Sequence, residues 1–234
     1  MIESLASMKS FRPKDEQGSP GKDDSNSFKP RNPEVDFHGQ KRSNQTHGSR
    51  TDPEAKLYRK GPGKPSQLAY LGHILNENRN GLILEVSVTE ANGTAERDAA
   101  LKMIDRYRGK HGRAPKTLGA DAGYDAGEFL LELEARGIEP HVAMTSTAPA
   151  DPETARGDRL EKIHARLRMK KRLESAGYPI SQRVRKKVEE CFGWLKTIAG
   201  FDKSRWFGRW KLAQSFELSA AAYNLIRMMK LQPS

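Results

Sequence analysis

The chain has 234 residues, of which 41 are Lys or Arg and 30 are Asp or Glu, so its formal net charge is +11 at pH 7. Its single cysteine, Cys191, excludes a disulfide framework and a thiolate zinc cluster, and no apolar run approaches the about 18 residues of a membrane span. The N-terminal stretch MIESLASMKSFRPKDEQ has no signal-peptide core, so we expect an intracellular, soluble protein without a membrane partner.

Residues 1–66 differ in composition from the rest of the chain. From residue 11 onward this segment is a mixture of Pro, Gly, Ser, Asn, Lys and Asp with almost no apolar residues. Such a segment cannot bury enough surface to offset the entropy lost on ordering. We therefore predict a polar, largely irregular N-terminal arm over 1–66 and a folded domain over 67–231. Asp36 and Asp52 are expected to be loop residues, and His38 and His47 are not expected to bind a metal.

A β-hairpin and a helix are predicted to open the folded domain. QLAYLGHILN and GLILEVSVTEA are apolar and are separated by the turn-forming ENRNG, which indicates a hairpin over residues 67–91. The following TAERDAALKMIDRYRG has apolar residues at helical spacing, and Thr94 is the candidate N-cap.

A short strand, a helix and another short strand come next. KTLGAD predicts a strand that ends at Asp121. EFLLELEARG predicts a helix that ends at Gly137, and IEPHVAM predicts a second short strand. Asp125 is the expected N-cap of the intervening helix. The order β-β-α-β-α-β predicts an α/β fold with a mixed sheet flanked by helices.

The carboxyl-terminal third is predicted to be helical and is strongly basic. Helices are expected near residues 158–175, 181–198 and 210–231. Residues 156–211 contain 17 Lys or Arg and 6 Asp or Glu, whereas the remainder of the chain has 24 of each. Charge concentrated in this way is typical of a surface that binds phosphates, so we expect a nucleic-acid partner.

The helix of residues 181–198 contains a pair of glutamates. Its buried stripe is predicted to be Val184, Val188, Cys191, Leu195 and Ile198. The adjacent stripe contains Arg185, Glu189 and Lys196, which places Glu189 at the edge of the core. Glu190 is rotated away toward Lys186 and Lys187, as expected for an ordinary surface charge pair worth about 0.2–0.5 kcal/mol.

Asp121 and Glu189 together suggest metal-assisted phosphoryl transfer. Asp121 follows an apolar strand, where α/β proteins commonly place ligand-binding groups. Two carboxylates in a basic surround suit Mg²⁺ or Mn²⁺, and two such ions can activate the attacking oxygen and stabilise the leaving one. Two ions normally need at least three acids.

Several stretches of the sequence match a known family. The spacing Arg185-x3-Glu189-x6-Lys196 fits the later part of the signature Y-x2-R-x3-E-x6-K. The chain resembles one bacterial subgroup of insertion-sequence transposases of the DDE, RNase H-like class over nearly its whole length, in NPEVDFHGQKRSN, TDPEAKLYRKG, YLGHILNENRNGLILEVSVTEANGTAERDAAL, GADAGYD, SQRVRKKVEECFGWLKT and AAAYNLIRM.

This resemblance implies an RNase H-like sheet that carries the catalytic, metal-binding acids. By position, Asp121 corresponds to the family's second aspartate and Glu189 to its glutamate. The signature tyrosine falls at Gln182, which departs from the pattern. The first aspartate, which in the family ends the first strand, has no counterpart ahead of Met1. The chain thus resembles an amino-terminally truncated transposase with an incomplete domain over 67–231, inactive on its own.

The resemblance also implies the partners. Double-stranded DNA, as insertion-sequence ends and target, would be bound through the phosphates by Arg185, Lys196, Lys186 and Lys187. A homodimer on DNA and a cytoplasmic, nucleoid-associated location in a bacterium follow as expectations.

An alternative from another class is a non-catalytic DNA-binding protein that uses the basic helices alone. In that alternative Trp194, Trp206 and Trp210 could stack on bases, although a core role is expected for at least two of them.

Overall fold

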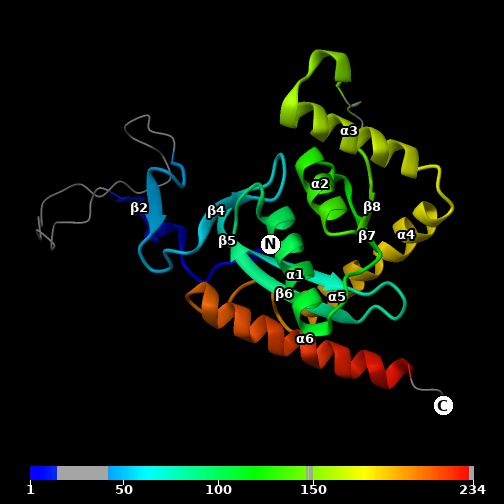
Figure 1. Ribbon diagram of the computed structural model, residues 1–234. Coiled ribbons are helices and arrows are strands. Elements are labelled where there is room, and N and C mark those ends of the chain that lie inside the picture. Colours follow the sequence, from blue (N-terminus) through cyan, green and yellow to red (C-terminus); the bar gives the residue numbers. More distant parts are fainter. Residues whose placement is uncertain (15–41, 146, 148–149, 232–234) are drawn as a thin grey trace, which may run out of the picture.

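The structure is a computed structural model that describes residues 1–14, 42–145, 147 and 150–231 (Figure 1). In chain order its strands and α-helices are β1 (Ile2–Glu3), β2 (Phe11–Pro13), β3 (His47–Ser49), β4 (Lys56–Arg59), β5 (Ser66–Asn76), β6 (Ile83–Glu90), α1 (Ala95–His111), β7 (Thr117–Ala120), α2 (Gly127–Ala135), β8 (Glu139–Val142), α3 (Gly157–Arg172), α4 (Gly177–Arg185), α5 (Lys187–Thr197) and α6 (Arg209–Leu231). None of the described helices is long and apolar enough to cross a lipid bilayer.

Strand β5 is the centre of a four-stranded antiparallel sheet. It pairs with β1, β4 and β6, and its pairing with β6 confirms the predicted hairpin. Tyr70 pairs with Ile2 of β1 and also with Glu90 of β6. Because a strand has two edges, β1 and β6 lie on opposite edges of β5.

Strands β7 and β8 form a separate parallel pair. Helix α2 connects them, as in a βαβ unit, and the predicted order β-β-α-β-α-β is confirmed. Gly137 follows α2 with φ 73°, the left-handed conformation that ends many helices. In Figure 1 this pair lies to the right of the sheet that carries β5 and β6. The expectation of an α/β fold is met, but the described residues form three sheets, the third being the antiparallel pair of β2 and β3, in place of one continuous mixed sheet.

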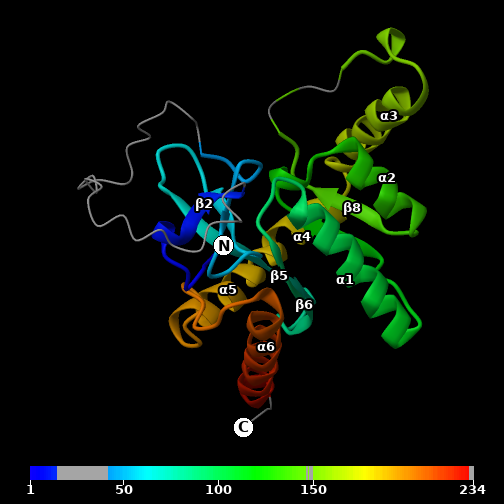
Figure 2. The same cartoon turned by 90° about the vertical axis from the view of Figure 1, so that its left-hand side faces the viewer.

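Helices cover both faces of the four-stranded sheet. Helix α6 contributes Leu212, Phe216 and Tyr223 to the larger core cluster, together with Leu68 and Tyr70 of β5. Helix α1 packs against β5 and β6 from the other side. Figure 2 shows α6 leading away from this packed region toward the C-terminus.

The described part of residues 1–66 is not irregular, contrary to the expectation for the arm. It holds β1 to β4, and Ile2, Phe11 and Ala55 are buried. Strand β4 pairs with β5, so the ordered structure runs through the expected boundary at residue 66. Ile2, Phe11 and Ala55 belong to the core cluster of the larger sheet.

Asp52 lies in the loop between β3 and β4, as predicted, but it is also the buried polar centre of this packing, which its surroundings in sequence did not indicate. It is 1% exposed. Its carboxylate accepts hydrogen bonds from Ser4 Oγ at 2.7 Å, Tyr70 OH at 2.6 Å and the Gly208 amide at 3.0 Å. Ser4 follows β1, Tyr70 belongs to β5 and Gly208 directly precedes α6. One buried carboxylate therefore joins three segments of the chain. Asp36 and His38 lie outside the described residues.

The prediction of one continuous helix over residues 181–198 is wrong, because two helices occupy this region. Two helices, α4 and α5, meet at Lys186, where the Lys186 and Glu189 amides donate to carbonyls three residues back. This tighter hydrogen bonding changes the helical phase. Cys191 and Leu195 are buried as predicted, whereas Ile198 is 69% exposed.

Candidate active site

Asp121 stands at the end of β7, where the chain turns into a short 3₁₀ turn, Ala122–Tyr124. Its Oδ1 accepts the Gly123 amide at 2.9 Å, which fixes the side chain at the start of the turn. The residue is exposed. A carboxylate in this position keeps its second oxygen available for a ligand.

Asp125 does not cap α2, contrary to the prediction. The N-cap position is Ala126, which has no side-chain acceptor. The Asp125 carboxylate instead forms a bidentate pair with Arg166, with Nε–Oδ1 3.0 Å and Nη2–Oδ2 2.7 Å, and accepts two hydrogen bonds from Thr145. Burial raises the pKa of this carboxyl, but the Arg166 and Thr145 hydrogen bonds outweigh burial and hold the pKa below its usual value. Asp125 thus attaches the loop after β7 to α3.

Asp121 opens onto a pocket of about 480 Å³, which we call the inter-sheet pocket. One wall is formed by β5 and the other by β7, including Gly119 and Asp121. Helices also contribute to the lining: Glu96, Ala100, Met103 and Tyr107 of α1, and Arg185, Val188 and Phe192 of α4 and α5. Leu84 of β6 and residues 113–116 ahead of β7 line the pocket as well.

The close approach of α4 explains the glycine in β7. A Cβ on Gly119 would lie 3.0 Å from Ser181 Oγ and 3.5 Å from the Ser181 carbonyl oxygen of α4. A larger residue would therefore push α4 away from β7. The same packing places the Arg185 side chain in the pocket wall.

Burial controls the ionisation of the groups around the inter-sheet pocket. His73 of β5 is buried, and desolvation together with the nearby Met1 amino group lowers its pKa to about 4. Burial also raises the pKa of Tyr124, with Glu96 and Asp121 adding to the shift. Both rings are therefore neutral at pH 7.

The structure brings only some of the predicted site residues together. Asp121 and Arg185 line the inter-sheet pocket. Glu189 follows the pocket residue Val188 but does not line the pocket, and it is exposed, so its predicted place at the edge of the core is wrong. The break at Lys186 accounts for this difference, because Glu189 lies in the first turn of α5.

The predicted DNA-binding lysines differ in their surroundings. Lys186 is exposed, and no ion pair involves it in the part of the chain that the structure describes. Lys187 donates to the Arg79 carbonyl at 2.5 Å, in the turn between β5 and β6. Lys196 lies close enough to the Met1 amino group to help lower the pKa of that amine, after the larger effect of burial.

Gln182, which replaces the signature tyrosine, has a structural contact of its own. Its side-chain amide donates to the carbonyl of Ala120 at 3.4 Å and to the carbonyl of His141. These carbonyls belong to β7 and β8, so Gln182 holds α4 across the carboxyl ends of both parallel strands.

Much of the positive charge on α3 is paired with acids of α2 and its surroundings. Arg168 and Arg172 both bind Glu134, at 2.5 Å and 2.9 Å. Hydrogen bonds from these arginines hold the pKa of Glu134 below its usual value, although burial opposes the shift. Lys170, Lys171, Arg183 and Lys186 are exposed, and the described residues form no ion pair with them. These four cations therefore lie between the end of α3 and the junction of α4 and α5.

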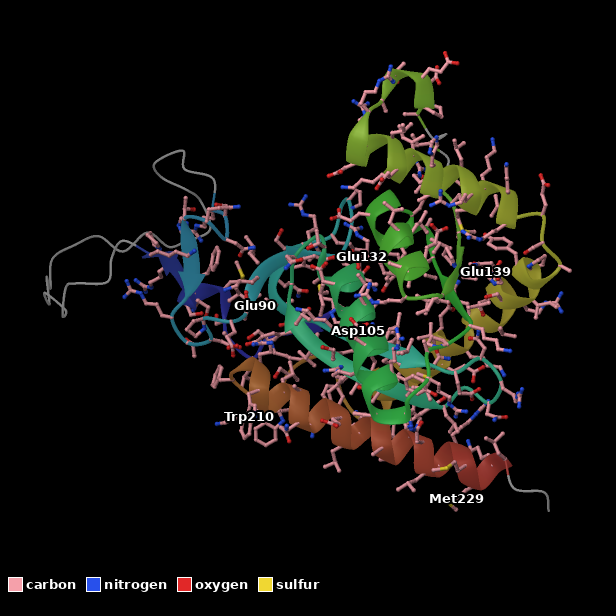
Figure 3. The ribbon with its side chains drawn as sticks, in the orientation of Figure 1. Glu90, Asp105, Glu132, Glu139, Trp210 and Met229 are labelled. Atoms are coloured by element: carbon pink, nitrogen blue, oxygen red, sulfur yellow. The ribbon has the colours of Figure 1, made fainter. Side chains whose placement is uncertain are left out.

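The tryptophans do not occupy the core as expected. Only Trp194 packs against the core cluster, where its ring meets Tyr223 edge-on at 5.7 Å. Trp206 and Trp210 are exposed. Figure 3 shows Trp210 near the start of α6 and Met229 near its end, both on the side turned away from the sheet.

Glu96 and Glu77 are pocket carboxylates that the sequence did not indicate, and Glu77 already accepts three backbone amides of the turn between β5 and β6. Within the described residues, Glu96 has no such role. It lies in the first turn of α1, where an acid is favoured by the helix dipole alone, so its position carries no distinct signal. Together with Asp121 it gives the inter-sheet pocket two exposed carboxylates.

The donor set suits a hard divalent cation only in part. The carboxylates of Asp121, Glu96 and Glu189 offer the oxygen ligands that Mg²⁺ and Mn²⁺ prefer. Within the described ranges, however, no three Asp, Glu, His or Cys side chains lie close enough to hold a metal ion. The exposed acids can each contribute to a site, but they do not form a complete one.

Comparison with known proteins identifies the family. No curated protein and no solved structure matches the chain. The family described as transposase DDE domain matches residues 35–225, which include β4 to β8 and most of α6. With Asp121 and Glu189 both inside the matched region, the chain belongs to the family of transposases with a DDE domain.

Proposed function

We propose that this chain is an insertion-sequence transposase whose chemistry is metal-dependent DNA cleavage and strand transfer, with Asp121 and Glu189 as its catalytic acids. The observation that carries the proposal is the position of Asp121, exposed at the carboxyl end of a parallel strand and in one pocket with Arg185, in a chain of the DDE family. Strand ends of this kind are where open α/β sheets bind ligands.

Mg²⁺ or Mn²⁺ would be held by Asp121 and Glu189, and in a site with two such ions one would activate the attacking oxygen and the other would stabilise the leaving one. The protein's own part is positioning. The Gly123 amide holds Oδ1 of Asp121, and the Asp125–Arg166 pair fixes the loop that follows. Arg185 in the pocket wall would orient a DNA phosphate beside Asp121.

We propose that DNA follows the free cations from α3 to α5. Lys186 and Arg185, with Lys196 and Lys187 farther along α5, would neutralise phosphates, and the exposed Lys170, Lys171 and Arg183 extend this path. Contacts of this type bind any sequence and weaken steeply with salt. The arginines of α3 that pair with Glu134 are engaged within the protein and contribute less.

We further propose that the fold is a variant of the RNase H type whose site needs a further acid. Two carboxylates hold one metal ion well, and a displacement with two ions then lacks one of its two stabilised oxygens. Asp52 cannot supply the missing ligand, because its carboxylate is buried among three donors. The 234-residue chain alone is therefore expected to nick DNA slowly without completing transposition.

Self-association is proposed through the outer face of α6. Trp210, Leu218, Leu225 and Met229 are 63% to 74% exposed and recur at spacings of 8, 7 and 4 residues. This stripe extends over about 29 Å at 1.5 Å per residue. An antiparallel pair of α6 helices related by a two-fold axis would place Trp210 of one copy beside Met229 of the other and Leu218 beside Ala221. Such a dimer fits a bacterial protein that brings two DNA ends together on the nucleoid in the cytoplasm.

A non-catalytic DNA-binding function is the second candidate. It is favoured by the absence of a three-ligand cluster within the described ranges and by the exposure of Trp206 and Trp210, which could stack on bases.

A nicking assay separates the two functions. Supercoiled DNA is incubated with the chain and about 5–10 mM MnCl₂, because carboxylate oxygens suit Mn²⁺ as a ligand set. The catalytic proposal expects slow nicking that Asp121→Asn abolishes and Glu190→Gln leaves unchanged. DNA binding with no nicking above the Asp121→Asn level would support the second candidate.

A further inference from the structure

We propose that Gln182 is a positioning residue of the candidate active site, which sets the orientation of the Arg185 guanidinium relative to Asp121. The inference rests on the proposed function, in which Arg185 orients a DNA phosphate beside Asp121. It concerns the position at which the chain departs from the signature Y-x2-R-x3-E-x6-K, where glutamine stands in place of tyrosine.

The side-chain amide of Gln182 is anchored to the parallel strands. Its Nε2 donates to the carbonyl of Ala120 at 3.4 Å and to the carbonyl of His141. The Ala120 carbonyl also accepts the Ala143 amide at 3.0 Å, and Ala120 and His141 are both buried, so the anchor lies in the packed interior of the βαβ unit. Ala120 directly precedes Asp121, which places the anchor beside the proposed catalytic acid.

The same amide holds Arg185. This arginine lies one helical turn after Gln182 in α4, and its Nε donates to Gln182 Oε1 at 3.3 Å. Carbonyl oxygens can only accept hydrogen bonds, so the amide nitrogen must face the strands and the amide oxygen must face Arg185. The three hydrogen bonds of Gln182 therefore agree on a single orientation of its amide.

The contact at Nε leaves the terminal nitrogens of the guanidinium for a ligand. Arg185 is half-buried in the wall of the inter-sheet pocket, and no carboxylate of the described residues pairs with it. Its Nη1 and Nη2 groups can bind two phosphate oxygens at once. Because Gln182 is tied to the strand that ends before Asp121, a phosphate held by Arg185 has a fixed place relative to the Asp121 carboxylate.

Glutamine suits this role for a chemical reason. A primary amide has two hydrogens and one oxygen, which match two carbonyls and one guanidinium N–H. The hydroxyl of a tyrosine has a single hydrogen and could not donate to both carbonyls. A long arginine side chain normally loses rotamer freedom when it binds a ligand, so an arginine that is already held binds a phosphate at a smaller entropic cost.

A double-mutant cycle in the full chain tests the inference. DNA affinity is measured by fluorescence anisotropy with one short duplex at one salt concentration, because salt alters every phosphate contact. Gln182→Met removes the three hydrogen bonds and keeps an unbranched side chain, and Arg185→Gln removes the proposed phosphate contact. Arg183→Gln, which removes an exposed cation from the same helix, is the matched control.

Gln182→Met is expected to weaken DNA binding about fivefold in the natural chain and in Arg183→Gln, but less than about twofold once Arg185 is replaced. An undiminished loss in the Arg185→Gln background would mean that Gln182 does not act through Arg185, and would overturn the inference while leaving the proposed function intact. If Arg185→Gln bound DNA as tightly as the natural chain, the phosphate contact in the proposed function would itself be wrong, and the inference would fall with it.

The NMR signal of the Arg185 side chain gives a readout that does not depend on DNA. Hydrogen exchange at Arg185 Nε should be at least about tenfold faster in Gln182→Met than in the natural chain, because the hydrogen bond that protects it is lost. Gln182→Glu keeps an acceptor oxygen for Nε and should retain slow exchange. Equal exchange in the natural chain and Gln182→Met, or equally fast exchange in both variants, would overturn the inference. Circular dichroism checks that each variant is folded.

Discussion

His73 gives the protein a pH-dependent stability whose size follows from its burial. The ring is 5% exposed, and its Nε2 lies 2.8 Å from Thr89 Oγ1. Its pKa is lowered from 6.5 to about 4, first by desolvation and then by the Met1 amino group. Between these two values the unfolded chain binds a proton that the folded protein excludes. The free energy of unfolding therefore falls as the pH is lowered through this window.

The expected loss can be estimated from the two pKa values. One pKa unit corresponds to about 1.4 kcal/mol, so lowering the pH from 7.5 to 4.5 should reduce the free energy of unfolding by about 2–3 kcal/mol through His73 alone. The control is His73→Gln, which keeps a hydrogen-bonding group near Thr89 but does not titrate in this range.

Urea unfolding followed by tryptophan fluorescence measures both proteins at each pH. The natural chain should lose about 2–3 kcal/mol more than His73→Gln between pH 7.5 and 4.5, because the other titrating groups are common to both and cancel. Identical pH dependence in the two proteins would refute the reasoning and would mean that the His73 ring is accessible to protons in the folded state.

Four further predictions follow from individual contacts. Asp125→Asn should lower the free energy of unfolding by about 3–5 kcal/mol near pH 7, because it leaves Arg166 without its charged partner. Since the pKa of Asp125 is lowered in the folded protein, this difference from the natural chain should persist above pH 5 and shrink as the pH falls below about 4. Urea titrations at each pH measure it. Leu195→Ala should lower the free energy of unfolding by about 2–5 kcal/mol, because Leu195 is fully buried. Glu190→Gln should change it by less than about 0.5 kcal/mol, because the exposed Glu190 carboxylate lies 3.6 Å from Arg227 in a surface ion pair. Equal losses would contradict the assignment of the buried face of α5. DNA affinity, measured by fluorescence anisotropy, should fall steeply between about 50 and 200 mM salt. The double variant Arg185→Gln, Lys196→Gln should weaken DNA binding more than the double variant Lys56→Gln, Arg59→Gln. The reverse ranking would place DNA on the N-terminal segment. Leu218→Glu should shift any dimer seen by light scattering to monomer without lowering the melting temperature, while an unchanged mass would exclude α6 as the interface.

The sequence predicts the elements whose signals are local. The hairpin of β5 and β6, the strand that ends at Asp121 and the helix that ends before Gly137 combine periodic apolar residues with turn residues at their ends. These features depend on neighbours within a few positions, and the structure confirms them.

The burial of Asp52 and the ion pair of Asp125 escaped prediction because the partners of these residues are distant in sequence. Asp52 lies in polar sequence, and its burial depends on Tyr70 and on Gly208, which is 156 positions away. Asp125 precedes a helix like an ordinary cap, but Arg166 is placed beside it by the packing of α2 against α3. In both cases tertiary contacts outweigh the local preference.

The junction of α4 and α5 shows the same limitation at the candidate site. Neither glycine nor proline marks a break at Lys186, so the continuous 3.6-residue pattern of 181–198 predicts one helix. The break separates α4, which packs on β7 and β8, from α5, which packs on β5 and α6. The exposure of Glu189 follows from this division and could not be read from the helical pattern.

The central claim, that Asp121 and Glu189 serve one metal site, is tested most directly by Mn²⁺ titration of the isotope-labelled chain in NMR. Paramagnetic broadening should appear together in the amides of residues 119–123 and 187–191 at the lowest Mn²⁺ concentrations. Asp121→Asn should abolish the broadening in both segments, and Glu190→Gln should leave it unchanged. Broadening confined to one segment, or broadening of both that survives Asp121→Asn, would contradict the claim.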